Sequence, residues 1–120
     1  MTTELKLAEL TRDVLQILSA WGTNSAQQRM LLGLPIGSPD YYRLDIPLPE
    51  DKEVLLRVET LLAIDQSVCL VFPHAPELAR LWITTPSHLF GRRTPLEVML
   101  AEGLSGIMDV RSLLDGTEVW

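Results

Sequence analysis

Residues that usually build an enzyme site are scarce in this sequence. Its 120 residues include one cysteine, Cys69, and two histidines, His74 and His88. A single cysteine excludes an internal disulfide framework and a multi-thiolate metal site. Neither histidine has a second ligand at metal-binding spacing, and the sequence contains no Gly-x-Gly-x-x-Gly or Walker phosphate loop. We therefore expect no catalytic residue, no metal site and no cofactor, and we expect Cys69 to be a small core residue.

Positive charge is also in deficit. Ten lysines and arginines face 16 aspartates and glutamates, which gives a formal net charge of -6. A protein whose main work is to hold phosphates needs a surplus of lysine or arginine. The balance therefore favours a basic protein partner over nucleic acid.

Long apolar runs are missing as well. No run approaches the roughly 18 residues that span a bilayer, and the segment 1–4, Met-Thr-Thr-Glu, has no basic stretch of the signal-peptide kind. The composition is ordinary for a globular protein, with 47% hydrophobic and 22% charged residues. We expect one compact, cytoplasmic domain with no membrane association.

Apolar residues at helical spacing dominate the first 48 residues. They predict an amphipathic helix over residues 3–21 that ends near Gly22. Asn24 or Ser25 can cap a second, short helix, which Gly33 stops. Ser38-Pro39 has the form of an N-cap followed by a proline at the first helical position, which predicts a helix over residues 39–44.

The strongest helical pattern, residues 51–72, opens the second lobe after Pro47 and Pro49. Asp65 interrupts its apolar face, where a bend could occur. Three more helices are expected, over residues 77–83, 94–103 and 105–114. Thr94-Pro95-Leu96-Glu97 is the clearest local signal, because it combines a threonine cap, a proline at the first position and a glutamate that returns the hydrogen bond.

Alternating strand patterns and internal repeats are absent from the sequence. We therefore predict an all-α fold, a small orthogonal bundle with two lobes, 1–48 and 49–120.

The segment 79–104, ARLWITTPSHLFGRRTPLEVMLAEGL, resembles the C-terminal signature of the Xre/MbcA/ParS antitoxins. In that family a helix ending in tryptophan leads through a short loop to an aromatic residue. Gly-Arg-Ser-Pro-Leu-Glu, a helix and a glycine then follow. The matching residues are Trp82, Pro86, Phe90, Arg93, Thr94, Pro95, Leu96, Glu97 and Gly103. Arg92 stands where the family often has glycine, which predicts a different backbone path for this loop.

The upstream half resembles an Xre-like helix-turn-helix lobe. The residues that carry this likeness are Trp21, Leu31-Leu32-Gly33, Tyr42, Arg57 and the run Leu61-Leu62-Ala63-Ile64. The resemblance thus covers nearly the whole chain. It matches the DNA-binding template less well than the C-terminal signature, because Pro35 lies in the expected turn.

This resemblance implies a type II antitoxin whose partner is a RES-domain toxin, an enzyme that consumes NAD. The antitoxin would silence the toxin by contact, with its C-terminal region obstructing the NAD pocket. It would also form a homodimer, which the apolar surface of residues 51–72 favours independently. The candidate toxin-binding residues are Trp82, Phe90, Arg92, Arg93, Leu96, Arg111, Asp115, Glu118 and Trp120.

Each of these assignments has a structural alternative. Trp82, Phe90 and Leu96 are equally the kind of large apolar residues that pack into a core. The terminal segment 116–120 combines acidic charge with an indole ring, which suits an NAD pocket, but Trp120 could instead fold back onto the last helix.

DNA binding is a further expectation for residues 39–44, where Tyr41, Tyr42 and Arg43 could face phosphates or bases. The segment 21–46 has two positive and two negative residues, so that any operator binding by this chain alone should be weak. Two other functions stay open, a helix-turn-helix regulator that needs no toxin and a helical adaptor. A RES-domain reading frame beside this one would favour the antitoxin.

Overall fold

Helices form nearly all the regular structure in the computed structural model, which describes residues 2–35, 37–41 and 46–116. Within these ranges there is no strand, and one isolated bridge joins Ser87 and Arg93. The elements are α1 (Thr2–Ala20), α2 (Ser25–Leu32), α4 (Lys52–Val71), α5 (Pro76–Ala79), η1 (Arg80–Thr84), η2 (His88–Phe90), α6 (Pro95–Glu102) and α7 (Leu104–Gly116). The all-α prediction is confirmed.

The connection between α1 and α2 follows the sequence signals closely. Gly22 takes a left-handed φ of 85°, which ends α1. The Asn24 side chain accepts a hydrogen bond from Gln27 N at 2.8 Å, and Gln27 Oε1 accepts one from Asn24 N at 3.0 Å. This reciprocal capping box starts α2 by pairing amides that have no partner within the helix.

The predicted helix start at Ser38 is wrong. Residues 38–40 are not helical, and helical geometry first appears at Tyr41. The Ser38 hydroxyl donates to Pro35 O at 2.7 Å, and Ser38 N donates to the same oxygen at 3.1 Å. Ser38 therefore closes a turn instead of capping a helix, a competing use of the short hydroxyl side chain.

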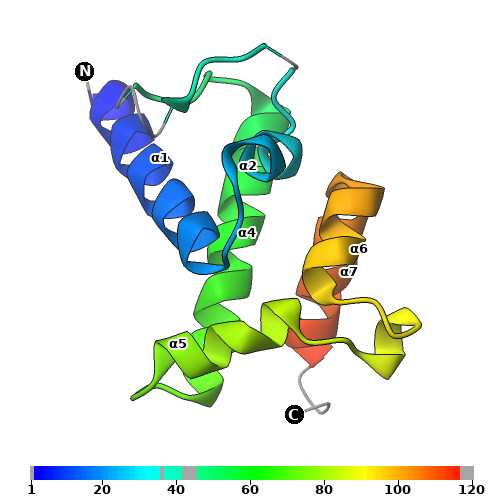
Figure 1. The fold of residues 1–120 in the computed structure, drawn as a ribbon. Helices are drawn as coiled ribbons and strands as arrows, with labels where there is room; N and C mark the ends of the chain where they lie inside the picture. The colour runs from blue at the N-terminus through cyan, green and yellow to red at the C-terminus, as the bar shows by residue number, and fades with distance from the viewer. Residues whose placement is uncertain (1, 36, 42–45, 117–120) are drawn as a thin grey trace.

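Helix α4 is the central element of the fold, and Figure 1 shows it running between α1 and the pair α6 and α7. Asp51 caps it by accepting from Glu53 N and Val54 N. The helix continues without interruption through Asp65, so no break occurs where the sequence lost its apolar pattern. One hydrophobic core joins elements from the whole chain, including Leu18 of α1, Leu31 of α2, Leu61 of α4, Ile83 of η1 and Ile107 of α7.

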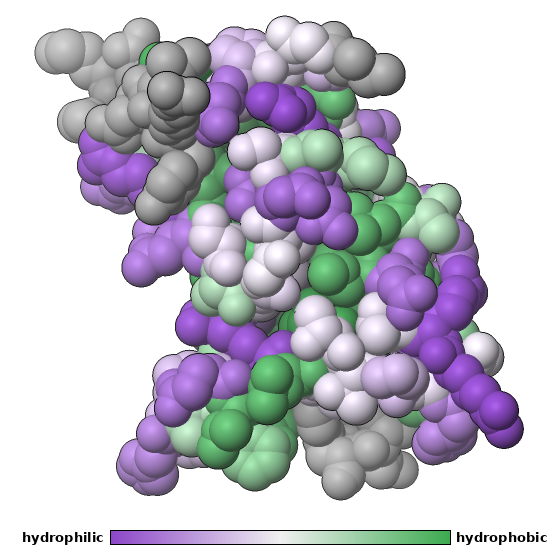
Figure 2. All heavy atoms as spheres, viewed as in Figure 1, coloured by the Kyte–Doolittle hydropathy of each residue, from purple (hydrophilic) through white to green (hydrophobic). Residues whose placement is uncertain are grey.

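Not all apolar side chains reach this core. Several leucines together with Phe72 and two methionines remain more than a third exposed. On the face drawn in Figure 2, apolar residues reach the surface over α5 and η1, at the lower left. No helix in the described ranges is both long enough and apolar enough to cross a membrane.

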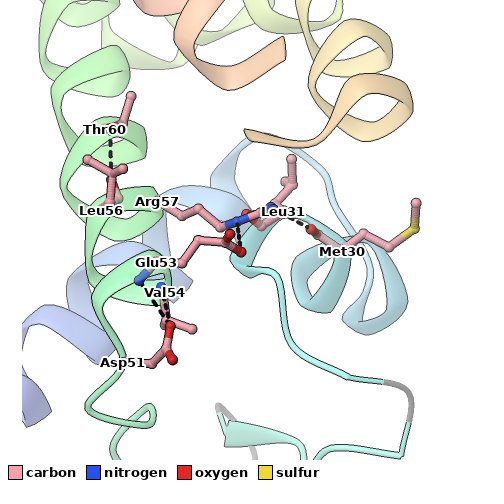
Figure 3. Close-up of polar contacts among 8 residues, drawn as sticks. All are labelled: Met30, Leu31, Asp51, Glu53, Val54, Leu56, Arg57 and Thr60. Atoms are coloured by element: carbon pink, nitrogen blue, oxygen red, sulfur yellow. Dashed lines mark hydrogen bonds and ion pairs between the residues drawn. The ribbon is translucent and has the colours of Figure 1, made fainter. Parts of the chain in front are cut away.

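Arg57 fastens the end of α2 to α4. Its Nη1 donates to Met30 O at 3.3 Å and to Leu31 O at 3.2 Å, and its Nε lies 3.3 Å from a Glu53 carboxylate oxygen (Figure 3). These carbonyls are at the carboxyl end of α2, where a cation is favoured. Glycine is favoured at position 33, because its φ of 72° is left-handed and a Cβ there would displace the Arg57 guanidinium.

The segment predicted as a helix over 77–83 is helical but of two kinds. One short α-turn, α5, continues directly into the 3₁₀ helix η1. The tighter winding of η1 still buries Ile83, while Trp82 is half-buried and Leu81 is exposed. Helices α6 and α7 then follow as predicted, and the turn between them places Gly106 against α6. A Cβ on Gly106 would lie 2.4 Å from Val98 O, so the two helices approach closely only because this residue is glycine.

Candidate functional site

The loop that joins η1 to α6 contains the candidate residues Phe90, Arg92 and Arg93, and backbone hydrogen bonds close it into a compact unit. Ser87 N donates to Arg93 O at 3.0 Å, and Arg92 N donates to Ser87 O at 2.8 Å. The Ser87 hydroxyl accepts from Leu89 N at 3.2 Å, which caps the short η2 helix inside the loop. The loop therefore presents its tip in one defined conformation.

The tip of this loop has two consecutive residues in the left-handed region. Gly91 has a φ of 64° and Arg92 a φ of 70°, and Arg92 is the one non-glycine residue with positive φ in the described chain. A side chain with a Cβ is disfavoured in this conformation. Arg92 thus adopts glycine-like geometry at the position where glycine would be easier, and its side chain is exposed to solvent.

Arg93 ties the loop to helix α6. Its Nε donates to Phe90 O at 3.3 Å, and its Nη2 lies 2.9 Å from a carboxylate oxygen of Glu102. Both partners are about half exposed, so the ion pair contributes modestly to stability. The guanidinium remains accessible to a partner from the solvent side.

The base of the loop is fixed by the predicted capping box. The Thr94 hydroxyl accepts from Glu97 N at 3.0 Å, and Glu97 Oε1 accepts from Thr94 N at 2.9 Å. Pro95 occupies the first turn and is buried. This prediction is confirmed, and the cap sets the direction in which the loop leaves α6.

The apolar candidates anchor the loop by packing in or against the hydrophobic core. Leu96 is buried in the core, while Trp82 and Phe90 are half-buried and pack against that core. These three residues therefore have the packing role that the sequence left open. Cys69 is also only partly buried and lies at the edge of the core, so the expectation of a core cysteine is wrong.

The remaining candidates lie in other parts of the chain. Arg111 and Asp115 are one turn apart on α7, and their side chains form an ion pair at 3.2 Å. Tyr41 is half-buried and packs against the core. The other four, Tyr42, Arg43, Glu118 and Trp120, lie outside the described residues.

A cluster around Asp65 was missed by the sequence reasoning. Asp65 Oδ1 accepts from Trp21 Nε1 at 2.9 Å and from Arg80 Nε at 2.8 Å, and Oδ2 accepts from Arg80 Nη2 at 2.9 Å. This carboxylate therefore joins the turn after α1, helix α4 and η1 at one point. A carboxylate within an apolar stripe signals a buried partner, and that signal was instead interpreted as a bend.

The contacts around Asp65 shift the pKa values of two neighbouring groups, Arg80 and Cys69. The hydrogen bond from Arg80 to Asp65 raises the pKa of the Arg80 guanidinium, so this cation stays charged far into the alkaline range. Partial burial, followed by the nearby Asp65 charge, raises the pKa of the Cys69 thiol. The cluster thus disfavours a reactive thiolate next to it.

Comparison with known proteins finds a match for the C-terminal part of the chain, which contains the loop. Residues 70–118 match the antitoxin Xre/MbcA/ParS C-terminal toxin-binding domain. This part of the chain is therefore similar to the toxin-binding domain of the Xre/MbcA/ParS antitoxins. Searches of curated proteins and of solved structures find no match.

The Xre/MbcA/ParS domain begins at Leu70, in the last turn of α4, and includes α5, η1, η2, α6 and the described part of α7. The domain that this segment resembles is the part of these antitoxins that binds the toxin. The family is one of binding proteins and not of enzymes, which agrees with the lack of catalytic residues in the sequence. The Asp65 carboxylate lies five residues before the domain and anchors Arg80 within it.

Proposed function

We propose that this protein is the antitoxin of a type II toxin–antitoxin pair and that it silences a RES-domain, NAD-consuming toxin by direct contact. The match of residues 70–118 to a toxin-binding domain carries this proposal. The RES identity of the toxin comes from the resemblance of the chain to its family. An acidic binding protein with net charge -6 also suits a partner that presents basic groups.

The proposed contact includes the loop that joins η1 to α6. Arg92 is exposed at the loop tip and Arg93 is half-exposed beside it, while hydrogen bonds fix the backbone that presents them. A preformed loop loses little conformational entropy on binding. In this proposal Trp82, Phe90 and Leu96 contribute by holding the loop in place.

Inhibition is proposed to involve the C-terminal end, from Arg111 to Trp120. Asp115 and Glu118 supply negative charge and Trp120 an aromatic ring, which could occupy a pocket that accepts the pyrophosphate and rings of NAD. Removal of residues 116–120 should leave the fold intact yet weaken inhibition of NAD consumption by the purified toxin. Undiminished inhibition would return the inhibitory contact to the loop.

Two further properties are proposed for the intact protein. It forms a homodimer, which light scattering at micromolar concentration tests, since a clean monomer would contradict it. It binds operator DNA weakly by itself and more tightly with the toxin. Tight binding by the free antitoxin with a steep salt dependence would contradict the second property.

The decisive experiment looks for a RES-domain reading frame beside this one and expresses the chain together with its product. We expect the antitoxin to restore growth that the toxin arrests, and the two proteins to co-purify. A matched culture that expresses a chain lacking residues 70–120 should remain arrested. If the full chain leaves the toxin lethal and the proteins elute separately, the proposed function is wrong.

A further inference from the structure

An apolar patch lies on the surface where α4 ends and α5 and η1 begin. It consists of Leu70, Phe72, Leu78 and Leu81, whose exposed fractions are 71%, 53%, 57% and 56%. Apolar side chains gather at this position in Figure 2, over α5 and η1 at the lower left. We call these four residues the apolar patch.

The residues of the apolar patch are not the ones by which this segment packs into the core. The same segment already buries Val68, Ala79 and Ile83 in the core at 2% exposure or less. The four patch residues point elsewhere and together leave roughly 400 Å² of apolar surface in water, within the size range at which such patches are often functional. This area is about half of what one partner contributes to a standard protein interface.

The stretch of chain that carries the apolar patch has few charged residues. Between residues 70 and 91 the sequence has two charged side chains, Glu77 and Arg80. Arg80 is neutralised by its bidentate bond to Asp65, which leaves the exposed Glu77 as the net charge of this surface. The exposed residues 84–86 are also uncharged and continue the surface towards the loop.

We propose that the apolar patch is the principal contact surface for the toxin. This inference rests on the proposed function. The matched toxin-binding domain begins at Leu70, so all four patch residues lie within it. Apolar surface that a partner removes from water contributes favourably to association in proportion to its area. The complementary toxin surface is then an apolar, largely uncharged depression with a basic group opposite Glu77.

This assignment differs from the one that the sequence motif suggests. Trp82, Phe90 and Leu96 use their apolar surface to pack against the core, so less of it is available to a partner. Leu78 and Leu81 come from the same short stretch of chain but are more than half exposed. The motif residues build the scaffold, and the patch residues contact the toxin.

The test measures binding of the full-length antitoxin to a catalytically inactive variant of the neighbouring RES-domain toxin by isothermal titration calorimetry. We expect Leu78→Ser and Leu81→Ser each to raise Kd at least tenfold. Both side chains are exposed, so circular dichroism and the unfolding midpoint should stay near the wild-type values. Met30→Ser is the matched control, because Met30 is 54% exposed but lies outside the toxin-binding domain.

Two additional measurements probe the chemistry of the contact. Glu77→Lys should weaken binding at low salt and lose much of that effect at high salt, because the pair that it disrupts is screened. The wild-type Kd should change less than about tenfold between 50 and 500 mM salt, since apolar contact dominates. A steep salt dependence would contradict an apolar interface.

The outcomes separate this inference from the proposed function. If wild-type antitoxin binds the toxin and the two leucine variants bind equally well, the inference is wrong and the proposed function stands. If these variants lose self-association but keep toxin affinity, the patch is a homodimer interface and the inference is again wrong. Failure of the wild-type protein to bind would refute the proposed function and this inference with it.

Discussion

Removal of the Asp65 carboxylate should destabilise the protein more than a typical single substitution does. Asp65 is buried at 7% exposure, and its side chain accepts three hydrogen bonds from Trp21 and Arg80. Asp65→Ala would leave a guanidinium and an indole N–H without their acceptor. Because those donors hold the turn after α1 and the helix η1 against α4, the loss should be global.

The size of the effect follows from burial. Breaking a fully buried ion pair costs about 3–5 kcal/mol, because the remaining charge has no partner. The Arg80 side chain is 26% exposed and can turn partly towards water, which reduces this cost. We therefore expect Asp65→Ala to lower the free energy of unfolding by about 3 kcal/mol. Asp65→Asn should lose less, since its amide oxygen can still accept from Trp21.

Urea denaturation followed by far-ultraviolet circular dichroism measures this loss. With a urea dependence of about 1–3 kcal/mol/M, the midpoint should fall by roughly 1–3 M for Asp65→Ala. A double-mutant cycle with Arg80→Met should give a coupling energy of at least about 1 kcal/mol, because the second substitution removes the stranded cation. Strict additivity, or a loss below about 0.5 kcal/mol for Asp65→Ala, would refute the reasoning.

Three further predictions concern single residues. Gly106→Ala should destabilise the protein by about 1–3 kcal/mol although alanine has the higher helix propensity, because the new Cβ would meet Val98 O. Gly116→Ala is the control in the same denaturation assay, because the space around Gly116 is open. Arg92→Gly should stabilise the protein by up to about 1 kcal/mol in that assay, because glycine adopts the left-handed φ without the steric strain of a Cβ. A destabilisation would contradict the inference that the Arg92 backbone is strained. The rate of Cys69 alkylation should rise at higher pH in the folded protein than in the urea-unfolded one, because folding raises the pKa of this thiol. By linkage, the thiol adds stability at neutral pH that is lost as pH rises through the folded pKa. Equal midpoints of the two alkylation–pH profiles would exclude the pKa shift.

Local signals in the sequence determined most helix boundaries. The cap at Asn24, the capping box from Thr94 to Glu97 and the stop at Gly33 all depend on residues within one turn of each other. Such interactions hold in almost any tertiary context, which is why these predictions are confirmed. Ser38 shows the limit, because the same hydroxyl can cap a helix or close a turn, and local sequence does not decide between them.

The sequence by itself also determined the all-α class, the scarcity of residues that could form a catalytic site, and the resemblance of the C-terminal part to its family. Helical periodicity and a nearly contiguous motif are readable along the chain. Only the tertiary structure decided which apolar residues are buried, because Leu81 and Trp82 are neighbours in sequence yet differ in exposure. It alone paired Asp65 with Trp21, 44 residues away, and placed Gly106 against α6. Such contacts depend on how helices pack over long sequence separations, and no local pattern encodes that packing.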